Sequence, residues 1–347
     1  MDERVEMQYL VEDDNLTESH NNRFTEKSTK WKPNPYLGII LATVSSFFFS
    51  ICSVIVKWMV NIHPIELAAF RFIGVLLPAI PIAIWRKENL FPKGKRIMLI
   101  LRSFVGTTGL MLSFYAFRHM PLADASVIVF SVPVFVSVFA LVFLKEPCDA
   151  FSVLTICLTL TGVLLITRPM SIFGSSVPSL GSEDHISTDL WGGISAFSAT
   201  LFGANAYILL RVLKGLHFSV IMINFGTFAL IETLCISWFL GVLCLPQCGL
   251  ERLLILALGI FSFGGQILLT ISLQLEQAGP VSIARSADIV FAFIWQVLFF
   301  KEVPNIYSIL GAIFVTSSVI LIGFRKWALT LPDNSSIKKT LQMFSSK

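Results

Sequence analysis

The sequence predicts an all-α polytopic membrane protein with ten transmembrane helices arranged as two inverted five-helix repeats. Of its 347 residues, 55% are hydrophobic and only 14% are charged, and the mean hydropathy is +0.77. The 20 residues from Ala125 to Leu144 carry no charge, and such a run crosses a bilayer core at a rise of about 1.5 Å per residue. This segment ends at Lys145-Glu146, and a similar segment ends at Lys301-Glu302, 156 residues later. The chain is therefore expected to be a duplicated membrane protein.

Ten apolar segments of membrane-spanning length follow a polar N-terminal stretch. Residues 1–35 are polar, with an acidic start and a basic end, and are predicted to form a disordered cytosolic tail. The first repeat is expected over residues 36–168 and the second over 190–326, with a non-cytosolic loop at 169–189 and a second cytosolic tail at 327–347. The predicted segments lie near 36–56, 65–85, 97–117, 124–144, 150–167, 190–210, 219–241, 253–273, 280–300 and 305–324.

Loop charges predict the orientation of these segments. An even number of segments puts both tails on one side of the membrane, and that side collects 16 Lys and Arg residues within about 20 residues of the segment ends, against 5 on the other. The excess of positive charge places both termini in the cytosol. The polar, acidic N-terminus indicates that the first apolar segment is a retained helix and not a cleaved signal. Two glycosylation sequons, at Asn15 and Asn334, then lie on the side where they are not used.

The first and sixth segments align at an offset of 154 residues. Each repeat has five segments, an odd number, so the second copy inserts with the opposite orientation. Inverted repeats are a device of secondary transporters, in which one half rocks against the other around a central site. The duplication is also compatible with a stable bundle that transports nothing. The aligned pairs include Gly38 with Gly192, Lys57 with Arg211, and His63 with His217.

Several short sequences resemble a known family. The paired segment ends Leu144-Lys145-Glu146 and Phe300-Lys301-Glu302 are similar to the EamA repeats of the drug/metabolite transporter superfamily. The resemblance covers about residues 36–326 and implies ten helices, cytosolic termini, carriage of a small solute, and a place in the endoplasmic reticulum or the plasma membrane. The second copy departs from the first by having Asp288-Ile289 in place of Val132-Pro133. Two further stretches resemble the same superfamily: Glu66–Arg71, and Phe114–Phe117 leading into Pro121–Ala125. Three others resemble subfamily G of solute carrier family 35 most: Ile97–Gly106, Phe261–Gly265 and Gln277–Ser282.

Other classes of protein lack support in the sequence. There is no phosphate loop, no zinc-binding HExxH motif, no nucleophile elbow and no pair of cysteines with metal spacing. The net charge of +4 is small, and the basic residues lie in short loops, which does not suggest nucleic acid. We therefore expect no enzyme activity, cofactor or metal. Cys244 and Cys248 either pair across their loop or stay free.

Charged residues inside apolar segments are the candidate functional residues, because each is costly at membrane depth. Arg71 has no acidic neighbour on its face of the helix and is the leading candidate for binding an anion. Arg102 is either a second binding residue or a side chain that extends back to the lipid headgroups. Arg285 and Asp288 are three residues apart, so they either bind solute or neutralise each other.

Further candidates are polar groups at the same depth. Glu232 is expected to pair with a basic residue or to relay a proton. Asn224 and Gln266 hydrogen-bond either to a solute or between helices, and Tyr115 either lines a cavity or faces lipid. Glu146 and Glu302 are predicted to be structural, with the neighbouring lysines offsetting their charge. Close helix approach is expected at Gly106, Gly109, Gly264 and Gly265.

Together these features predict a secondary transporter that moves a small organic anion by alternating access. A guanidinium group binds a carboxylate through two parallel hydrogen bonds, so the intramembrane arginines favour a carboxylate metabolite that is citrate-like, or a phosphorylated or nucleotide-sugar cargo. The alternative is a non-transporting regulator that binds a partner membrane protein, with a role in calcium homeostasis suggested by the resemblance. A homodimer is compatible with both interpretations.

Overall fold

The computed structural model describes residues 36–59, 62–92, 94–119, 125, 128–146, 149–167, 183–241, 249–300 and 306–329, and their secondary structure is entirely helical. Eight helices are long and apolar enough to cross a membrane, and the shorter apolar stretches Val132–Leu144 and Ala150–Ile166 complete the ten predicted segments. The helices are α2 (Leu37–Trp58), α3 (Pro64–Arg86), α4 (Arg96–His119), α6 (Val132–Phe139) with the π-helix η1 (Ala140–Leu144), α7 (Ala150–Thr167), α9 (Glu183–Val212), α10 (Phe218–Phe239), α11 (Leu250–Leu275), α12 (Ala278–Arg285), α13 (Ala287–Phe300) and α14 (Ile306–Leu329).

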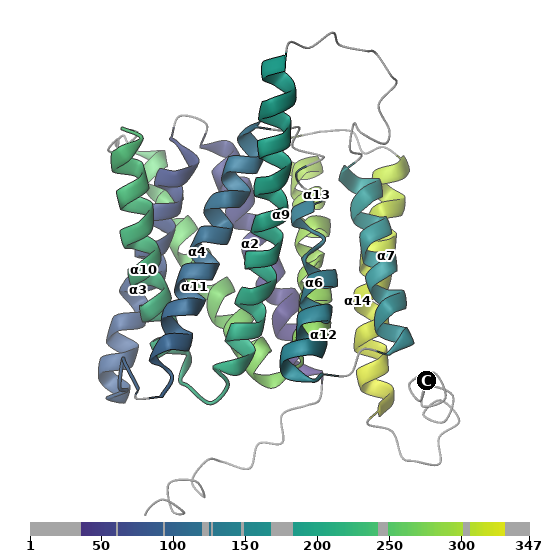
Figure 1. Cartoon of the computed structure of the whole chain (residues 1–347), viewed down its shortest axis with the longest axis horizontal. Coiled ribbons are helices and arrows are strands. Elements are labelled where there is room, and N and C mark those ends of the chain that lie inside the picture. The colour runs from purple at the N-terminus through teal and green to yellow at the C-terminus, as the bar shows by residue number, and fades with distance from the viewer. Residues whose placement is uncertain are drawn as a thin grey trace, which may run out of the picture. The chain divides into compact units, whose positions relative to one another are not determined.

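The two repeats interlock instead of forming separate bundles. Helix α4 of the first repeat packs along α9 of the second, and the equivalent pair with the repeats exchanged, α11 and α2, packs in the same way. Two further pairs join counterpart helices, α3 with α10 and α7 with α14, and Figure 1 shows the latter pair side by side. Every major contact thus has its symmetry mate, as inverted repeats around a pseudo-two-fold axis require.

The ends of equivalent helices are also built alike. The side chain of His63 accepts a hydrogen bond from the backbone N–H of Ile65 at the start of α3, and His217 accepts one from Ser219 at the start of α10, both at 3.3 Å. Each histidine satisfies a donor that the first turn of a helix leaves without a partner. The alignment of His63 with His217 therefore reflects a shared helix cap.

Two helix crossings bring backbone against backbone. A Cβ atom added at Gly74 of α3 would lie 2.2 Å from the Cα of Gly259 of α11. A Cβ at Gly162 of α7 would lie 2.7 Å from the carbonyl oxygen of Gly311 of α14. In a bilayer, where no hydrophobic force draws apolar helices together, such small residues allow the close packing that holds helices in contact.

The fourth and ninth segments, expected to be continuous helices, are both broken about a third of the way along the predicted span. In the ninth, α12 ends at Arg285 and α13 begins at Ala287; in the fourth, a turn at Phe130–Ser131 precedes α6. The 156-residue offset superimposes these two breaks. Pro133 accounts for the first break, because it has no N–H to donate to the preceding turn and lies in the first turn of α6.

Some boundaries also differ from the expected ones. Helix α9 begins at Glu183, inside the stretch 169–189 expected to be a loop, and α14 continues to Leu329. Hydropathy delimits the part of a helix in the hydrocarbon and does not mark where the helix ends outside it. Residues 1–35 and 330–347, which contain the two sequons, lie outside the described residues, as do Cys244, Cys248 and Glu302.

An ion-pair cluster joins the two repeats at the end of the bundle where α12 begins. Glu146 Oε1 accepts a hydrogen bond from Arg211 Nε at 3.1 Å, and Glu146 Oε2 accepts one from the backbone N–H of Ala278 at 3.0 Å. Glu146 is thus paired with Arg211 and with the N-terminus of α12, where a negative charge is favoured. The expectation that the neighbouring Lys145 offsets its charge is replaced by these two contacts. The cluster is completed by the ion pairs Asp149–Arg325 and Glu276–Lys326.

We predict that Glu146→Gln lowers the stability of the protein by about 1–3 kcal/mol, the usual cost of losing one charged hydrogen-bond partner. The amide can still accept from Ala278, so the fold survives. Thermal unfolding of detergent-solubilised protein measures the change. Glu88→Gln is the control, since Glu88 makes no ion pair within the described part of the chain. Equal melting temperatures for the two variants would contradict a structural role for Glu146.

Candidate functional site

A cavity of about 340 Å³ lies between the two repeats, at the level of the two helix breaks. It is lined by side chains of α2, α3, α4, α9, α10 and α11 and of both broken segments. Of the predicted residues, five line it: Arg71, Arg102, Gln266, Arg285 and Asp288. The sequence thus predicts the charged part of this wall. Further lining residues include Phe49, Val129, Val132, Tyr207 and Phe225.

The side chain of Arg102 points into the cavity. Its guanidinium lies over the ring of Phe225 at 4.4 Å, and a Cβ atom added at Gly106, one turn further along α4, would lie 2.1 Å from Nη1. The side chain therefore runs away from the nearer helix end at Arg96, which excludes the extension to the headgroups considered above. Arg102 is only 4% exposed, and its Nε and Nη1 atoms have no hydrogen-bond partner among the described residues.

Arg71 and Arg285 meet at one aromatic ring. The guanidinium carbon of Arg71 lies 5.0 Å from the centre of the Phe49 ring, and that of Arg285 lies 4.6 Å from it. Contact with an aromatic face stabilises a desolvated cation without using up its hydrogen-bond donors. Within the described part of the chain Arg71 makes no hydrogen bond or ion pair, so its donors are available to a ligand.

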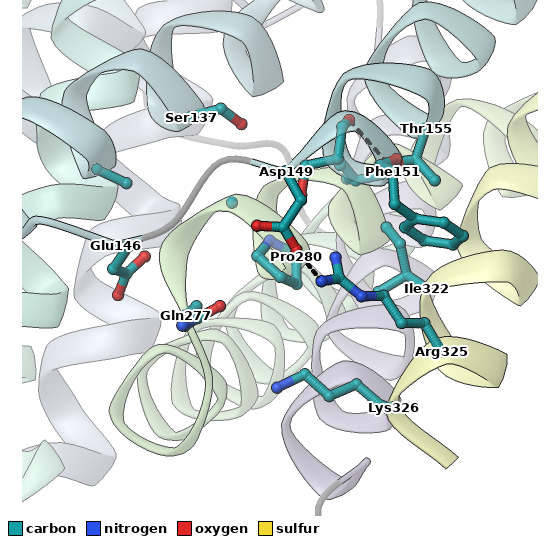
Figure 2. A pocket seen from close by; sticks show the side chains of 14 residues that line it. Ser137, Glu146, Asp149, Phe151, Thr155, Gln277, Pro280, Ile322, Arg325 and Lys326 are labelled. Carbon is teal, nitrogen blue, oxygen red and sulfur yellow. Dashed lines mark hydrogen bonds and ion pairs between the residues drawn. The ribbon is translucent and has the colours of Figure 1, made fainter. Parts of the chain in front are cut away.

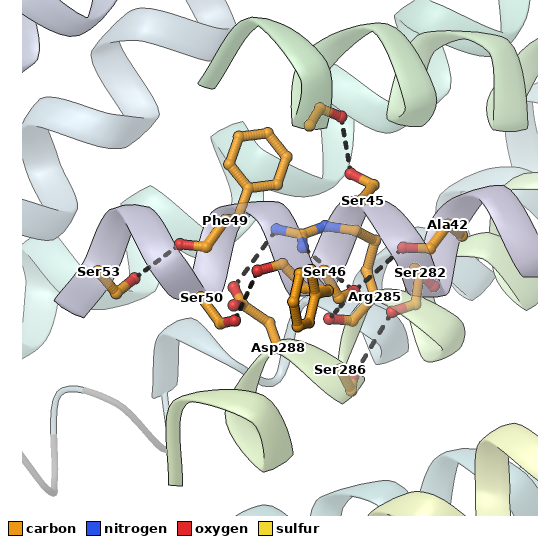
Figure 3. Close-up of polar contacts among 12 residues, drawn as sticks. Ala42, Ser45, Ser46, Phe49, Ser50, Ser53, Ser282, Arg285, Ser286 and Asp288 are labelled. Atoms are coloured by element: carbon orange, nitrogen blue, oxygen red, sulfur yellow. Dashed lines mark hydrogen bonds and ion pairs between the residues drawn. The ribbon is translucent and has the colours of Figure 1, made fainter. Parts of the chain in front are cut away.

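The break between α12 and α13 places Arg285 and Asp288 at opposed helix ends. Arg285 lies in the last turn of α12 and Asp288 in the first turn of α13, so each charge has the sign that the helix dipole favours there. Arg285 Nη2 is 3.5 Å from Asp288 Oδ2, and Arg285 Nη1 donates to Ser46 Oγ at 3.2 Å (Figure 3). Arg285 Nε and Asp288 Oδ1 remain without a partner among the described residues.

Three predicted candidates do not line this cavity. Asn224 donates to the carbonyl oxygens of Leu90 and Val220, and so holds the chain segment after α3. Glu232 accepts a hydrogen bond from Thr108 of α4 at 3.2 Å. Tyr115 is 45% exposed on the surface of the bundle. Position in an apolar segment does not fix which way a helical side chain faces, which is why the sequence could not separate these three from the others.

Sequence reasoning missed the aromatic and hydroxyl groups around the arginines: Phe49, Ser46, Tyr207 and Phe225. One available signal was the repeat itself. Phe225 is the counterpart of Arg71 at the 154-residue offset, so a position facing the centre in one copy also faces it in the other. The ring in the second copy packs against Arg102 of the first.

A second cavity, of about 330 Å³, lies at the ion-pair cluster. Figure 2 shows Asp149, Arg325 and Lys326 around it, with Glu146 and Gln277 on the other side. The charged side chains that line it are all engaged in ion pairs: Glu146 with Arg211, Asp149 with Arg325, and Lys326 with Glu276. The central cavity, by contrast, presents guanidinium donors without protein partners, and it is the better site for an anion.

Comparison with known proteins identifies the family. The profile of the EamA-like transporter family matches residues 36–168 and 186–324, one match for each repeat. The chain belongs to the EamA-like transporter family. A solved structure with 14% sequence identity has a TM-score of 0.68 over 86% of this chain and 99% of its own, which shows the shared fold.

Relatives of this EamA-like chain are transporters, not enzymes. Human solute carrier family 35 member G1 is 42% identical over 87% of this chain and 83% of its own length. The mouse protein of the same name is 37% identical over 88% and 83%. A pseudopaline exporter of Pseudomonas aeruginosa is 30% identical over 83% of this chain and 96% of its own. The chain is thus a multi-pass membrane transporter that resembles subfamily G of solute carrier family 35.

We predict that Gly106→Ala displaces the guanidinium of Arg102 and weakens ligand binding by at most as much as Arg102→Ala does, because the new methyl group would lie 2.1 Å from Arg102 Nη1. Losing one charged hydrogen bond to a ligand costs about 1.5–3 kcal/mol, or roughly a 10–100-fold loss of affinity. Gly323→Ala is the control, since a Cβ there meets no atom within 4 Å. Ligand-dependent thermal stabilisation of purified protein measures the effect, and unchanged affinity in both Gly106→Ala and Arg102→Ala would show that Arg102 does not bind the ligand.

Proposed function

We propose that this EamA-like protein is a secondary transporter of a small organic anion, carried by alternating access through the central cavity. The observation that supports this most directly is the convergence of Arg71, Arg102 and Arg285 on one cavity between the repeats. A site of this kind, at the level of broken helices in inverted repeats, is where secondary transporters bind their solutes.

The charges of the cavity favour an anion over a cation or a neutral solute. Among the described residues that line it, three guanidinium groups stand against the one carboxylate of Asp288, an excess of two positive charges. An unpaired charge in a desolvated site is unfavourable, and a bound anion relieves that cost. The planar donors of arginine also match the geometry of carboxylate and phosphate oxygens. Carboxylate metabolites, phosphorylated compounds and nucleotide sugars share this chemistry.

The apolar rings in the wall set a second requirement. Phe49 and Phe225 hold the guanidinium groups from one side, so a ligand approaches them from the cavity. A cargo with a short carbon skeleton between its acidic groups can contact rings and arginines together. This combination favours a compact organic anion.

The rival interpretation is a membrane regulator that transports nothing and binds a partner membrane protein. A regulator needs a partner surface but has no use for buried guanidinium donors facing a cavity. The donors of Arg71 and Arg102 therefore favour the transporter.

We predict that Arg71→Ala and Arg102→Ala each reduce anion uptake by roughly 10–100-fold, the equivalent of one charged hydrogen bond. Arg→Lys at either position should also impair uptake, because lysine keeps the charge but loses the planar pair of donors. Uptake of labelled carboxylates and phosphates into proteoliposomes containing purified protein measures the effect. Normal uptake by both alanine variants at normal abundance would contradict the anion proposal and favour the regulator.

We also propose that both termini are cytosolic, as the loop charges indicate. A glycosylation sequon introduced between residues 175 and 182 should then be modified in cells, while the natural sequons at Asn15 and Asn334 stay bare. A change in electrophoretic mobility after enzymatic deglycosylation shows which sequon carries a glycan. Modification at Asn15 would reverse the orientation.

A further inference from the structure

The charge pair at the second helix break is not needed to build a break. At the 156-residue offset, Arg285 corresponds to Val129 and Asp288 to Val132. Both valines line the same cavity beside the turn at Phe130–Ser131. The first repeat makes an equivalent break with two apolar side chains at these positions, and Pro133 interrupts the helix there. The second repeat has no proline, but the hydroxyl of Ser46 is within hydrogen-bond distance of the carbonyl oxygen that the break leaves without its helical partner. Because the backbone at this break does not depend on the two charges, their cost at membrane depth points to a function.

Asp288 is poorly satisfied as an ionised carboxylate. Its nearest charged partner, Arg285 Nη2, is 3.5 Å away, beyond the usual length of about 2.7–2.9 Å for a hydrogen bond between charged groups. Its Oδ1 atom is buried and has no partner among the described residues. The carboxylate side chain is only 16% exposed, so water compensates little.

The ionisable groups that face Asp288 come from several helices. Arg285 of α12 and Arg71 of α3 both act on it electrostatically, and Cys52 of α2 is the third such group. Arg102 of α4 and Tyr207 of α9 line the same cavity, to which α10 and α11 contribute no ionisable side chain among their described residues. Asp288 is therefore the single carboxylate among the described residues of the cavity wall, and its charge depends on the guanidinium groups around it.

An anion that binds Arg285 changes the surroundings of Asp288. The cargo shares the guanidinium that balanced the carboxylate, and it brings a second negative charge into the same desolvated space. Two like charges in one site favour protonation of one of them. A protonated Asp288 can also donate its O–H to an oxygen of the cargo, which turns a repulsive neighbour into a hydrogen-bond donor.

We propose that Asp288 takes up one proton when the anion binds and releases it when the anion leaves, so that the protein couples anion transport to protons. The coupling rests on the proposed function. By linkage, a ligand that raises the proton affinity of Asp288 has its own affinity raised by the proton to the same extent. The proton comes from water on the loading side and returns to water on the other side, with Asp288 Oδ1 or Oδ2 as its carrier.

The test uses full-length protein in liposomes that enclose a pH-sensitive dye, with the membrane potential clamped by potassium and valinomycin. Labelled sulfate, succinate and citrate are the probes, and sulfate keeps its charge over the neutral pH range. An inward anion gradient applied without a pH gradient should acidify the lumen at about one proton per anion, and a tenfold proton gradient should sustain about a tenfold anion accumulation, since each pH unit equals one decade of concentration. Liposomes without protein correct for diffusion of the free acids.

The variants separate the coupling from transport itself. In Asp288→Asn the proton-to-anion ratio should fall to zero whatever rate of anion exchange remains, because the amide does not titrate. Glu232→Gln is the matched control: it removes a membrane-depth carboxylate outside the cavity and should keep the ratio.

Each other result has a definite meaning. Anion uptake with no proton movement, stimulation by a sodium gradient instead, or an unchanged ratio in Asp288→Asn overturns the coupling and leaves the proposed function standing. No flux of any of these probes, together with no uptake of the labelled phosphates used to test the proposed function, overturns both.

Discussion

A backbone hydrogen bond that is missing inside a bilayer has to be replaced by the protein, because no water is there to replace it. At the break in the ninth segment, the N–H of Ile289 bonds to Ser286, and the carbonyl oxygen of Arg285 loses its helical partner. The hydroxyl of Ser46 on α2 lies 3.1 Å from that oxygen, the same distance as from the carbonyl oxygen of Ala42, and its one proton can replace the missing donor. This replacement allows a helix to stop at membrane depth, and everything at the central site depends on it. The break turns two helix ends toward the cavity and brings a cation and an anion to the ends that favour them.

Neighbouring uncharged residues hold the arginines in place. Gly106 leaves room for the guanidinium of Arg102, and the Phe49 ring is shared by Arg71 and Arg285. Aromatic faces stabilise these cations without using their N–H groups, so Arg71 and Arg102 keep donors that a ligand can use. Serine hydroxyls, glycine and aromatic rings therefore form the support, and the charges form the site. A family resemblance based on apolar segments and their charged ends does not report on this support.

The sequence predicts the architecture well because the membrane imposes it. Segment length, the charged ends at Lys145-Glu146 and Lys301-Glu302, and the fixed offset between copies all follow from bilayer thickness and gene duplication. The cost of charge at membrane depth likewise selected Arg71, Arg102, Arg285 and Asp288. The directions of side chains could not be obtained in this way. Asn224 and Glu232 are also polar residues within an apolar segment, yet neither lines the cavity, because helix rotation is set by packing against neighbours. The break at Ser286 also escaped prediction, since no proline marks it.

The glycine crossings bear on how such a protein can move. Gly74 and Gly259 join a helix of the first repeat to one of the second, and so do Gly162 and Gly311, each with backbone directly against backbone. Helices packed this closely leave no side-chain layer that could slide or repack between them. The rigid blocks of a conformational change should therefore contain helices from both gene copies. The boundary between the two gene copies and the surface along which the helices move relative to one another are then different. Aligning the two repeats locates the boundary between the copies but not the surface along which the protein moves.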